Sequence, residues 1–67
     1  MEFVERARLR LTHWMDHNEK HREEYAGFAA QLEQAGKQAS AAHVRAMAEL
    51  TGKSDDCLRK ALKALES

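Results

Sequence analysis

Apolar residues recur at steps of three and four along the first half of the chain, and this spacing restricts the possible folds most. The positions at this spacing are Phe3, Ala7, Leu11, Trp14, Asn18, His21, Tyr25, Phe28, Leu32 and Ala35. A repeat of this length is typical of a helix packed lengthwise against other helices. It predicts one helix over residues 2–35, roughly 50 Å long at about 1.5 Å per residue.

Composition also favours helices. The chain of 67 residues has no proline, twelve alanines and no isoleucine, and it is rich in Glu, Lys, Arg and Gln, which are good helix formers. Gly36 directly follows the last position of the first pattern, where a left-handed glycine commonly ends a helix. We therefore expect an all-α chain with a turn at residues 36–37.

A second pattern of the same spacing predicts a helix over residues 38–66. Its positions are Val44, Met47, Thr51, Ser54, Leu58, Ala61 and Leu65. Gly52, followed by serine and two aspartates, is also a stop-and-restart signal for a helix. The pattern keeps its phase there and favours a continuous helix, at most kinked at 51–54. A three-helix chain with a break near Gly52 is the alternative.

A two-residue turn makes the predicted helices antiparallel neighbours, so residues whose numbers sum to about 73 lie side by side. Trp14 then faces Leu58, Phe28 faces Val44, and Tyr25 faces Met47. The polar interruptions of the two patterns fall at one level. This predicted polar layer consists of Asn18, His21, Thr51, Ser54 and Asp55.

The chain is short for a stable core, because a domain of this size buries only about 60% of the surface of its unfolded form. One cysteine, Cys57, excludes an internal disulfide. A single hairpin also has no second face to cover its apolar stripe. We therefore predict one helical domain over residues 1–67 that dimerises into an antiparallel four-helix bundle.

Charge and hydropathy restrict the partners. Eleven basic residues balance eleven acidic ones, so no net charge attracts nucleic acid, and no apolar run reaches the ~20 residues of a membrane span. A lone thiol fits a reducing compartment. We expect a cytoplasmic protein whose partner is a second copy of itself or another protein, and neither nucleic acid nor a membrane.

Three of the four histidines, His13, His17 and His21, are spaced by four, which stacks their rings along one side of a helix. In a structural interpretation, His21 and Asn18 fix the register of the bundle, as buried polar residues do in coiled coils. In a functional one, His17 and His21 bind Zn, Ni or Cu. Further ligands would then come from His13, Asp55, Cys57 or a second subunit.

Catalytic motifs are incomplete. His17 and His21 have the outer spacing of a zinc-protease helix, but Asn18 stands where the general-base glutamate belongs. None of the eight glutamates has a histidine three residues later, as di-iron bundles require. A Cys57–His17 nucleophile pair would lack an orienting third group. We expect a non-enzymatic protein with no certain cofactor.

The run from Trp14 to His21, with Tyr25 and an alanine-rich second half, resembles a small uncharacterised prokaryotic family of helical domains. Members of that family carry a His-Asn-x-x-His signature, which His17, Asn18 and His21 match here. The resemblance extends over residues 11–65. It implies no activity, and it marks these three residues as the first to examine.

Overall fold

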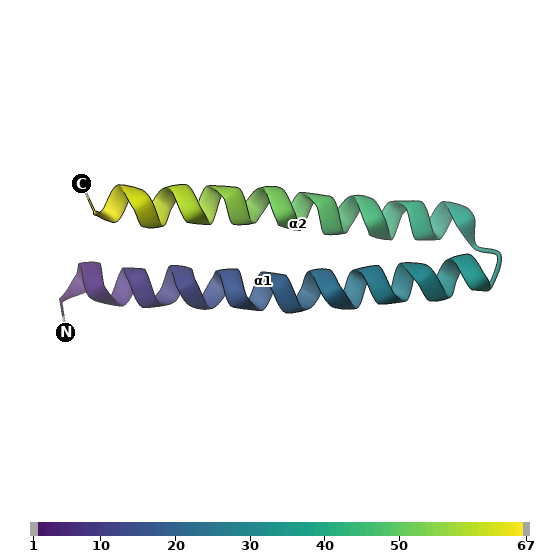
Figure 1. Ribbon diagram of the computed structural model, residues 1–67, viewed down its shortest axis with the longest axis horizontal. Coiled ribbons are helices and arrows are strands. Elements are labelled where there is room, and N and C mark those ends of the chain that lie inside the picture. The colour runs from purple at the N-terminus through teal and green to yellow at the C-terminus, as the bar shows by residue number, and fades with distance from the viewer. Residues whose placement is uncertain (1, 67) are drawn as a thin grey trace.

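Two long helices joined by one tight turn make up the described chain. The computed structural model describes residues 2–66, in which α1 spans Phe3–Gln34 and α2 spans Gln38–Leu65. The helices run side by side in opposite directions, with both termini at one end of the molecule (Figure 1). The predicted all-α hairpin is confirmed. Helix α2 continues through Gly52 without a break, so the three-helix alternative is wrong.

The turn has the hydrogen bonds of a Schellman motif. Gly36 adopts a left-handed conformation with φ 79°, as predicted. The Lys37 N–H donates to the carbonyl of Leu32 at 2.8 Å, and the Gly36 N–H donates to the carbonyl of Glu33 at 3.0 Å. These bonds satisfy carbonyls that the end of α1 would leave unpaired. The chain can therefore reverse within three residues and pack α2 directly against α1.

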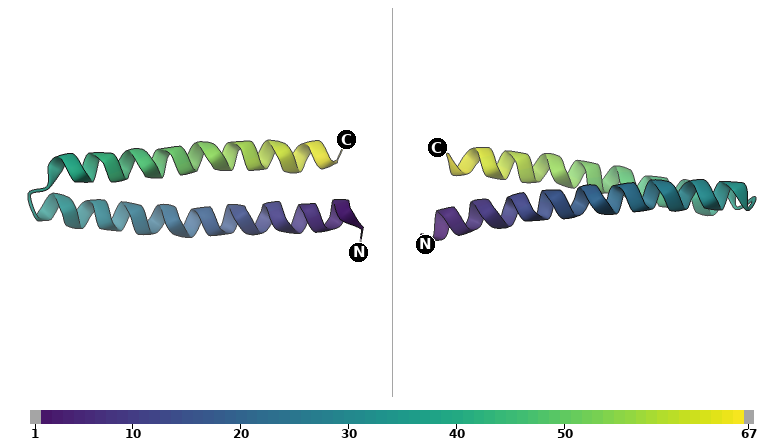
Figure 2. Two further views of the ribbon diagram at one scale, coloured as in Figure 1. Left: turned by 180° about the vertical axis from the view of Figure 1, so that it is seen from behind. Right: turned by 60° about the horizontal axis from the view of Figure 1, so that its bottom comes forward.

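The hairpin is a single layer of helices. Its Cα extents are 51 × 18 × 10 Å, so it is long, two helices wide and one helix thick. Two further views show the helices adjacent along their whole length and crossing at a shallow angle (Figure 2). A single layer leaves both broad sides of the molecule without a covering element.

The contact between the helices, which we call the seam, is lined mainly by small and aliphatic residues. The less exposed positions are Ala7, Leu11, Met15, Asn18, His21, Tyr25, Ala29, Leu32 and Glu33 in α1 and Ala41, Val44, Ala48, Thr51, Gly52, Asp55, Leu58, Leu62 and Leu65 in α2. Among residues 2–66, only Ala29, Ala41 and Asp55 are buried. The alanines let the two backbones approach closely.

The predicted pattern was wrong by one residue at several positions. Trp14 and Phe28 were expected between the helices but are 48% and 54% exposed, and Met47 is also exposed. Met15 and Ala29 lie in the seam instead. Two apolar stripes run along α1 about 100° apart, because adjacent helical residues differ by that angle. The stripe with the smaller side chains faces α2, because it allows closer packing.

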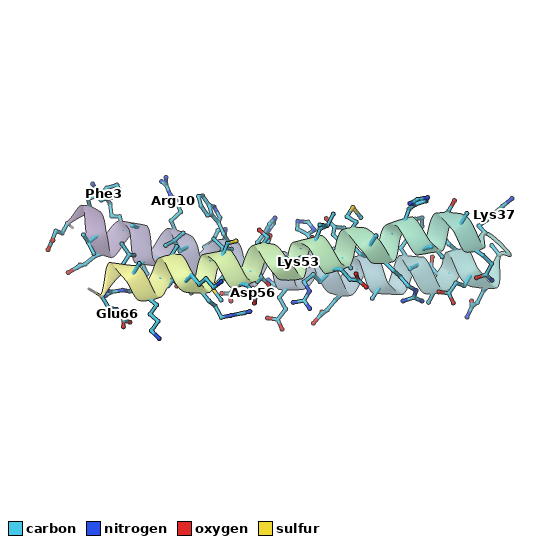
Figure 3. All side chains as sticks on the ribbon, turned by 90° about the horizontal axis from the view of Figure 1, so that it is seen from above. Phe3, Arg10, Lys37, Lys53, Asp56 and Glu66 are labelled. Atoms are coloured by element: carbon cyan, nitrogen blue, oxygen red, sulfur yellow. The ribbon has the colours of Figure 1, made fainter. Side chains whose placement is uncertain are left out.

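The displaced residues of both helices lie on one broad side. Two antiparallel helices are related by a two-fold rotation about an axis perpendicular to their common plane. Positions one residue before the seam therefore lie on the same side in α1 and in α2. We call this side the aromatic face and define it by Phe3, Trp14, His17, Phe28, Met47 and Leu50, with the half-buried His21 at its border with the seam. Figure 3 shows Phe3 and Arg10 on one side of the hairpin and Asp56 and Glu66 on the opposite one.

Candidate functional site

A buried carboxylate links the two helices at the middle of the seam. Asp55, only 5% exposed, accepts a hydrogen bond on Oδ1 from the Asn18 side-chain amide at 2.9 Å. Its Oδ2 lies 3.5 Å from the Arg22 guanidinium. The Arg22 side chain passes over Gly52, where a Cβ would lie 3.5 Å from it. Both carboxylate oxygens thus have partners, which a buried charge requires.

This arrangement contains part of the predicted polar layer. Asn18 lies beside Asp55, as the register of the hairpin requires. Thr51 instead donates to the Met47 carbonyl of its own helix, and Ser54 is exposed. The half-buried His21 has His17 and Glu24, both residues of α1, as polar partners.

Sequence reasoning missed Arg22, the second partner of Asp55. Arg22 follows Asn18 by four residues, so the two side chains lie on the same side of α1, one turn apart. That spacing was the available signal. Arg22 is exposed and reaches Asp55 from the edge of the seam, so the pattern of half-buried positions does not include it.

The histidines form a row of stacked rings along α1. The Nε2 atoms of His17 and His21 are 2.8 Å apart, and the two rings meet edge to face with centroids separated by 4.3 Å. The His13 ring stacks on His17 at 6.1 Å, and Tyr25 stacks on His21 at 5.8 Å. At this distance one Nε2 donates its N–H to the lone pair of the other, and the tautomers decide which of the two is the donor.

The predicted metal ligands do not converge within one chain. Residues 2–66 contain no group of three or more His, Cys, Asp or Glu that could hold a metal ion. His17 and His21 come together, whereas Asp55 is bound by Asn18 and Arg22 inside the seam. Cys57 is exposed on α2 and makes no disulfide. One copy of the chain therefore brings together two of the predicted ligands, His17 and His21.

The aromatic face also carries a groove near the N-terminus of α1. This groove encloses about 380 Å³. Its lining residues are Phe3, Arg6, Ala7, Arg10, Leu11 and Trp14. The groove ends one turn before His17, so its aromatic walls and the histidine pair form a continuous stripe.

The opposite broad side of the hairpin carries charged residues in place of aromatic ones. A depression of similar volume, about 380 Å³, lies there between the helices. It is lined by Glu19, Arg22, Glu23, Ala26, Ala48 and Glu49. Three carboxylates and a guanidinium keep this side hydrated, so apolar contacts are concentrated on the aromatic face.

None of the helices in residues 2–66 has a stretch apolar enough to span a bilayer. Comparison with curated proteins and with solved structures finds no significant match to this chain. A family of small domains does match, and it covers residues 7–65, which include both helices, the turn, the Asn18–Asp55 pair and the histidine row. The chain therefore belongs to the family described as Domain of unknown function (DUF8180).

Proposed function

We propose that this protein is a non-enzymatic self-associating module, in which two hairpins pack their aromatic faces together as a four-helix bundle. The observation that carries the proposal is the distribution of side chains. Phe3, Trp14, Phe28, Met47 and Leu50 are exposed on one side of a molecule that has almost no core. A large exposed apolar patch rimmed by polar residues marks an interaction surface.

The exposed area supports the same conclusion. The hairpin exposes 5267 Å². A folded monomer of 7.6 kDa exposes about 4,300 Å² by the usual scaling with mass. The excess is roughly a fifth, and a stable dimer buries about 800 Å² on each partner. A face measuring 51 by 18 Å is large enough to supply that area.

The Asn18–Asp55–Arg22 cluster is assigned a role in register. It contains the buried carboxylate of the seam, so a shift of α2 along α1 would leave Asp55 buried without its partners. A buried polar layer of this kind specifies one alignment over its neighbours. The proposed function of the cluster is thus to hold the aromatic residues of both helices in one fixed array.

The proposed partner is a second copy, or another protein with an aromatic helical face. The equal numbers of acidic and basic residues give no net charge for nucleic-acid binding. The unbridged Cys57 supports a reducing compartment such as the cytoplasm.

Sedimentation equilibrium over a range of concentrations tests the proposal. We expect a species of twice 7.6 kDa, and a melting temperature that rises with protein concentration, as linkage requires for a folded dimer. A mass of one chain up to about 1 mM, where binding is worth only about 4 kcal/mol, would contradict it.

A paired substitution tests the register role. The double variant Asn18→Leu with Asp55→Leu removes the polar layer and leaves Arg22 free to extend into solvent. We expect stability to stay equal or to rise, because a well-packed apolar pair often replaces a buried polar one without loss. The association should then become a mixture of alignments, seen as several masses or a broadened boundary. A single sharp dimer would contradict the register role.

We infer transition-metal binding at His17 and His21 as a second candidate function, because their Nε2 atoms lie 2.8 Å apart on an exposed helix face. Thermal melting with Zn²⁺, Ni²⁺ or Cu²⁺ tests it. A metal at 100 times its dissociation constant stabilises a protein by about 2.7 kcal/mol. The shift should disappear in His21→Ala and persist in His43→Ala, which removes an exposed histidine of α2. No shift with any of the three metals would contradict the inference.

A further inference from the structure

We propose that the metal site is shared, so that one transition-metal ion is bound between two copies of the chain by His17 and His21 of each. This inference rests on the proposed self-association. It adds the ligand set, the stoichiometry and the orientation of the two hairpins.

The pair already has the geometry of a half-site. Two imidazole nitrogens bound to one metal at about 2.0–2.1 Å lie about 2.9 Å apart at square-planar cis positions and about 3.4 Å apart at tetrahedral ones. The observed separation of Nε2 atoms is 2.8 Å. The backbone therefore already holds the two nitrogens at a chelating distance. Metal binding needs the rings to turn until both Nε2 lone pairs meet at the metal, with the proton of each neutral imidazole on its Nδ1.

A carboxylate stands behind the pair. Glu24 Oε2 lies 3.9 Å from Nδ1 of His21, on the side of the ring away from His17. Metal-bound histidines usually direct their second nitrogen toward such a carboxylate, which favours the tautomer with a free lone pair on the ligating nitrogen. Glu24 lies one turn after His21 and can take this part without any movement of the backbone.

The chain itself cannot complete the shell. Two nitrogens leave two positions of a tetrahedral or square-planar metal open, and no third protein ligand converges on the pair within residues 2–66. His17 lies on the aromatic face, and the half-buried His21 lies at the border of that face with the seam, both between Trp14 and Phe28 along α1. A second copy packed on this face would bring its own pair into reach.

The position of the pair decides the orientation. Helix α1 spans Phe3–Gln34, so its midpoint falls beside Asn18, between the two histidines. Two equal rods overlap fully in antiparallel packing when a two-fold axis crosses them at the midpoint. That axis sets the His17–His21 pair of one copy against the pair of the other. The two turns at Gly36 then lie at opposite ends of the dimer.

The same alignment pairs the rest of the face favourably. About this axis, residues of α1 whose numbers sum to about 38 face each other across the dimer. Arg10 of one copy then lies over Phe28 of the other, a cation on an aromatic ring. Trp14 of one copy lies level with Glu24 of the other. The Glu24 carboxylate is then one helical turn from the level of Arg10 of the first copy, so these opposite charges lie close together.

Zinc titration of the full chain, followed by calorimetry and sedimentation, tests the shared site. We expect one Zn²⁺ per two chains and a dimer dissociation constant about 100-fold lower at saturating metal, because a ligand of the dimer favours the dimer by mass action. His17→Ala and His21→Ala should each abolish this effect. His43→Ala and Cys57→Ser should keep it, because neither residue is in the proposed shell.

A distance measurement tests the orientation. Spin labels are placed on Lys37→Cys in a Cys57→Ser background, which leaves one label at each turn. If the two turns lie at opposite ends of the dimer, the distance between the two labels should be near the 51 Å length of the hairpin. If the two turns lay at the same end, the labels would be roughly 20 Å apart or less, which is two helix diameters including the labels. A distance in that range would overturn the proposed axis.

The outcomes separate this inference from the proposed function. One Zn²⁺ per chain with unchanged association overturns the shared site, as does a metal effect that survives both histidine variants. A dimer that ignores Zn²⁺ overturns the inference and leaves the self-association standing. A chain that stays monomeric with and without Zn²⁺ overturns both.

Discussion

The seam between the helices and the aromatic face beside it use opposite kinds of residue. The seam is closed by small side chains, and its fully enclosed positions are Ala29 and Ala41. The aromatic face carries the large residues, and Trp14 and Phe28 are both about half exposed there. In a chain that completes its own core the large residues would be the enclosed ones.

This difference shows how the chain divides two tasks. Alanines in the seam bring the helices close but bury little apolar area, so the seam holds the hairpin in shape without providing much hydrophobic stabilisation. The aromatic face has the area but no partner within a layer 10 Å thick. The hairpin therefore supplies only half of a core. Substitutions in the seam and substitutions on the aromatic face should affect different properties of the protein.

The largest effect is expected on the aromatic face. Trp14→Ala should weaken self-association by about 2–4 kcal/mol, which raises the dimer dissociation constant about 30- to 1,000-fold, as loss of a central aromatic anchor does at other interfaces. The helix content at concentrations that keep the dimer should change little. Sedimentation across a dilution series measures the constant.

Leu9→Ala is the matched control, because Leu9 is 60% exposed but lies outside both the seam and the aromatic face. Its loss should change association less than threefold. Equal effects of Trp14→Ala and Leu9→Ala would mean that exposure alone, and not the face, determines the result.

The fold could be predicted because it depends on regular features of the sequence. The period of the apolar residues, the absence of proline and the glycine at position 36 each predict one part of the hairpin, and α2 keeps its phase past Gly52. These are local signals, and tertiary contacts did not have to override any of them. The helix ends differ from prediction by about one residue.

The side chains of the site could be predicted less well, for a physical reason. Two apolar stripes on α1 differ by only one residue, and periodicity alone does not say which one faces α2. Size decided it, since Ala29 allows a closer approach than Phe28. Asn18 belongs to the same stripe as Ala29, and its pairing with Asp55 followed from the register. Arg22 was missed, because it is exposed and reaches Asp55 from the edge of the seam.

The next effect is expected in the seam. Ala29→Leu should destabilise the protein by about 1–3 kcal/mol, because a position with 0% exposure has no room for three more carbons. Urea unfolding at one fixed protein concentration measures it. Ala30→Leu is the control, because the neighbouring Ala30 is exposed and leucine is a good helix former. If Ala29→Leu were neutral, the helices would not be in close contact there.

A smaller effect is expected from the polar centre of the seam. Asp55→Ala should cost about 1–2 kcal/mol, because the Asn18 amide loses its acceptor, while Arg22, which is 46% exposed, can turn to water. Asp55→Asn keeps an acceptor for Asn18 and should cost less than half as much. Urea unfolding compares the two, and equal losses would show that charge, rather than the hydrogen bond, holds the layer.

The smallest effects on stability are expected at two glycines, and they have opposite signs. Gly36→Ala should destabilise by about 1–2 kcal/mol, because a φ of 79° is strained for alanine. Gly27→Ala should stabilise by about 0.5–1 kcal/mol, because Gly27 is inside α1 and an added Cβ meets no atom within 4 Å. Neither residue touches the aromatic face, so thermal unfolding should move in opposite directions while the dissociation constant of the folded hairpin stays the same. A changed constant in Gly36→Ala would show that the turn sets the array on the aromatic face, and the seam and that face would then not be separable parts of the molecule.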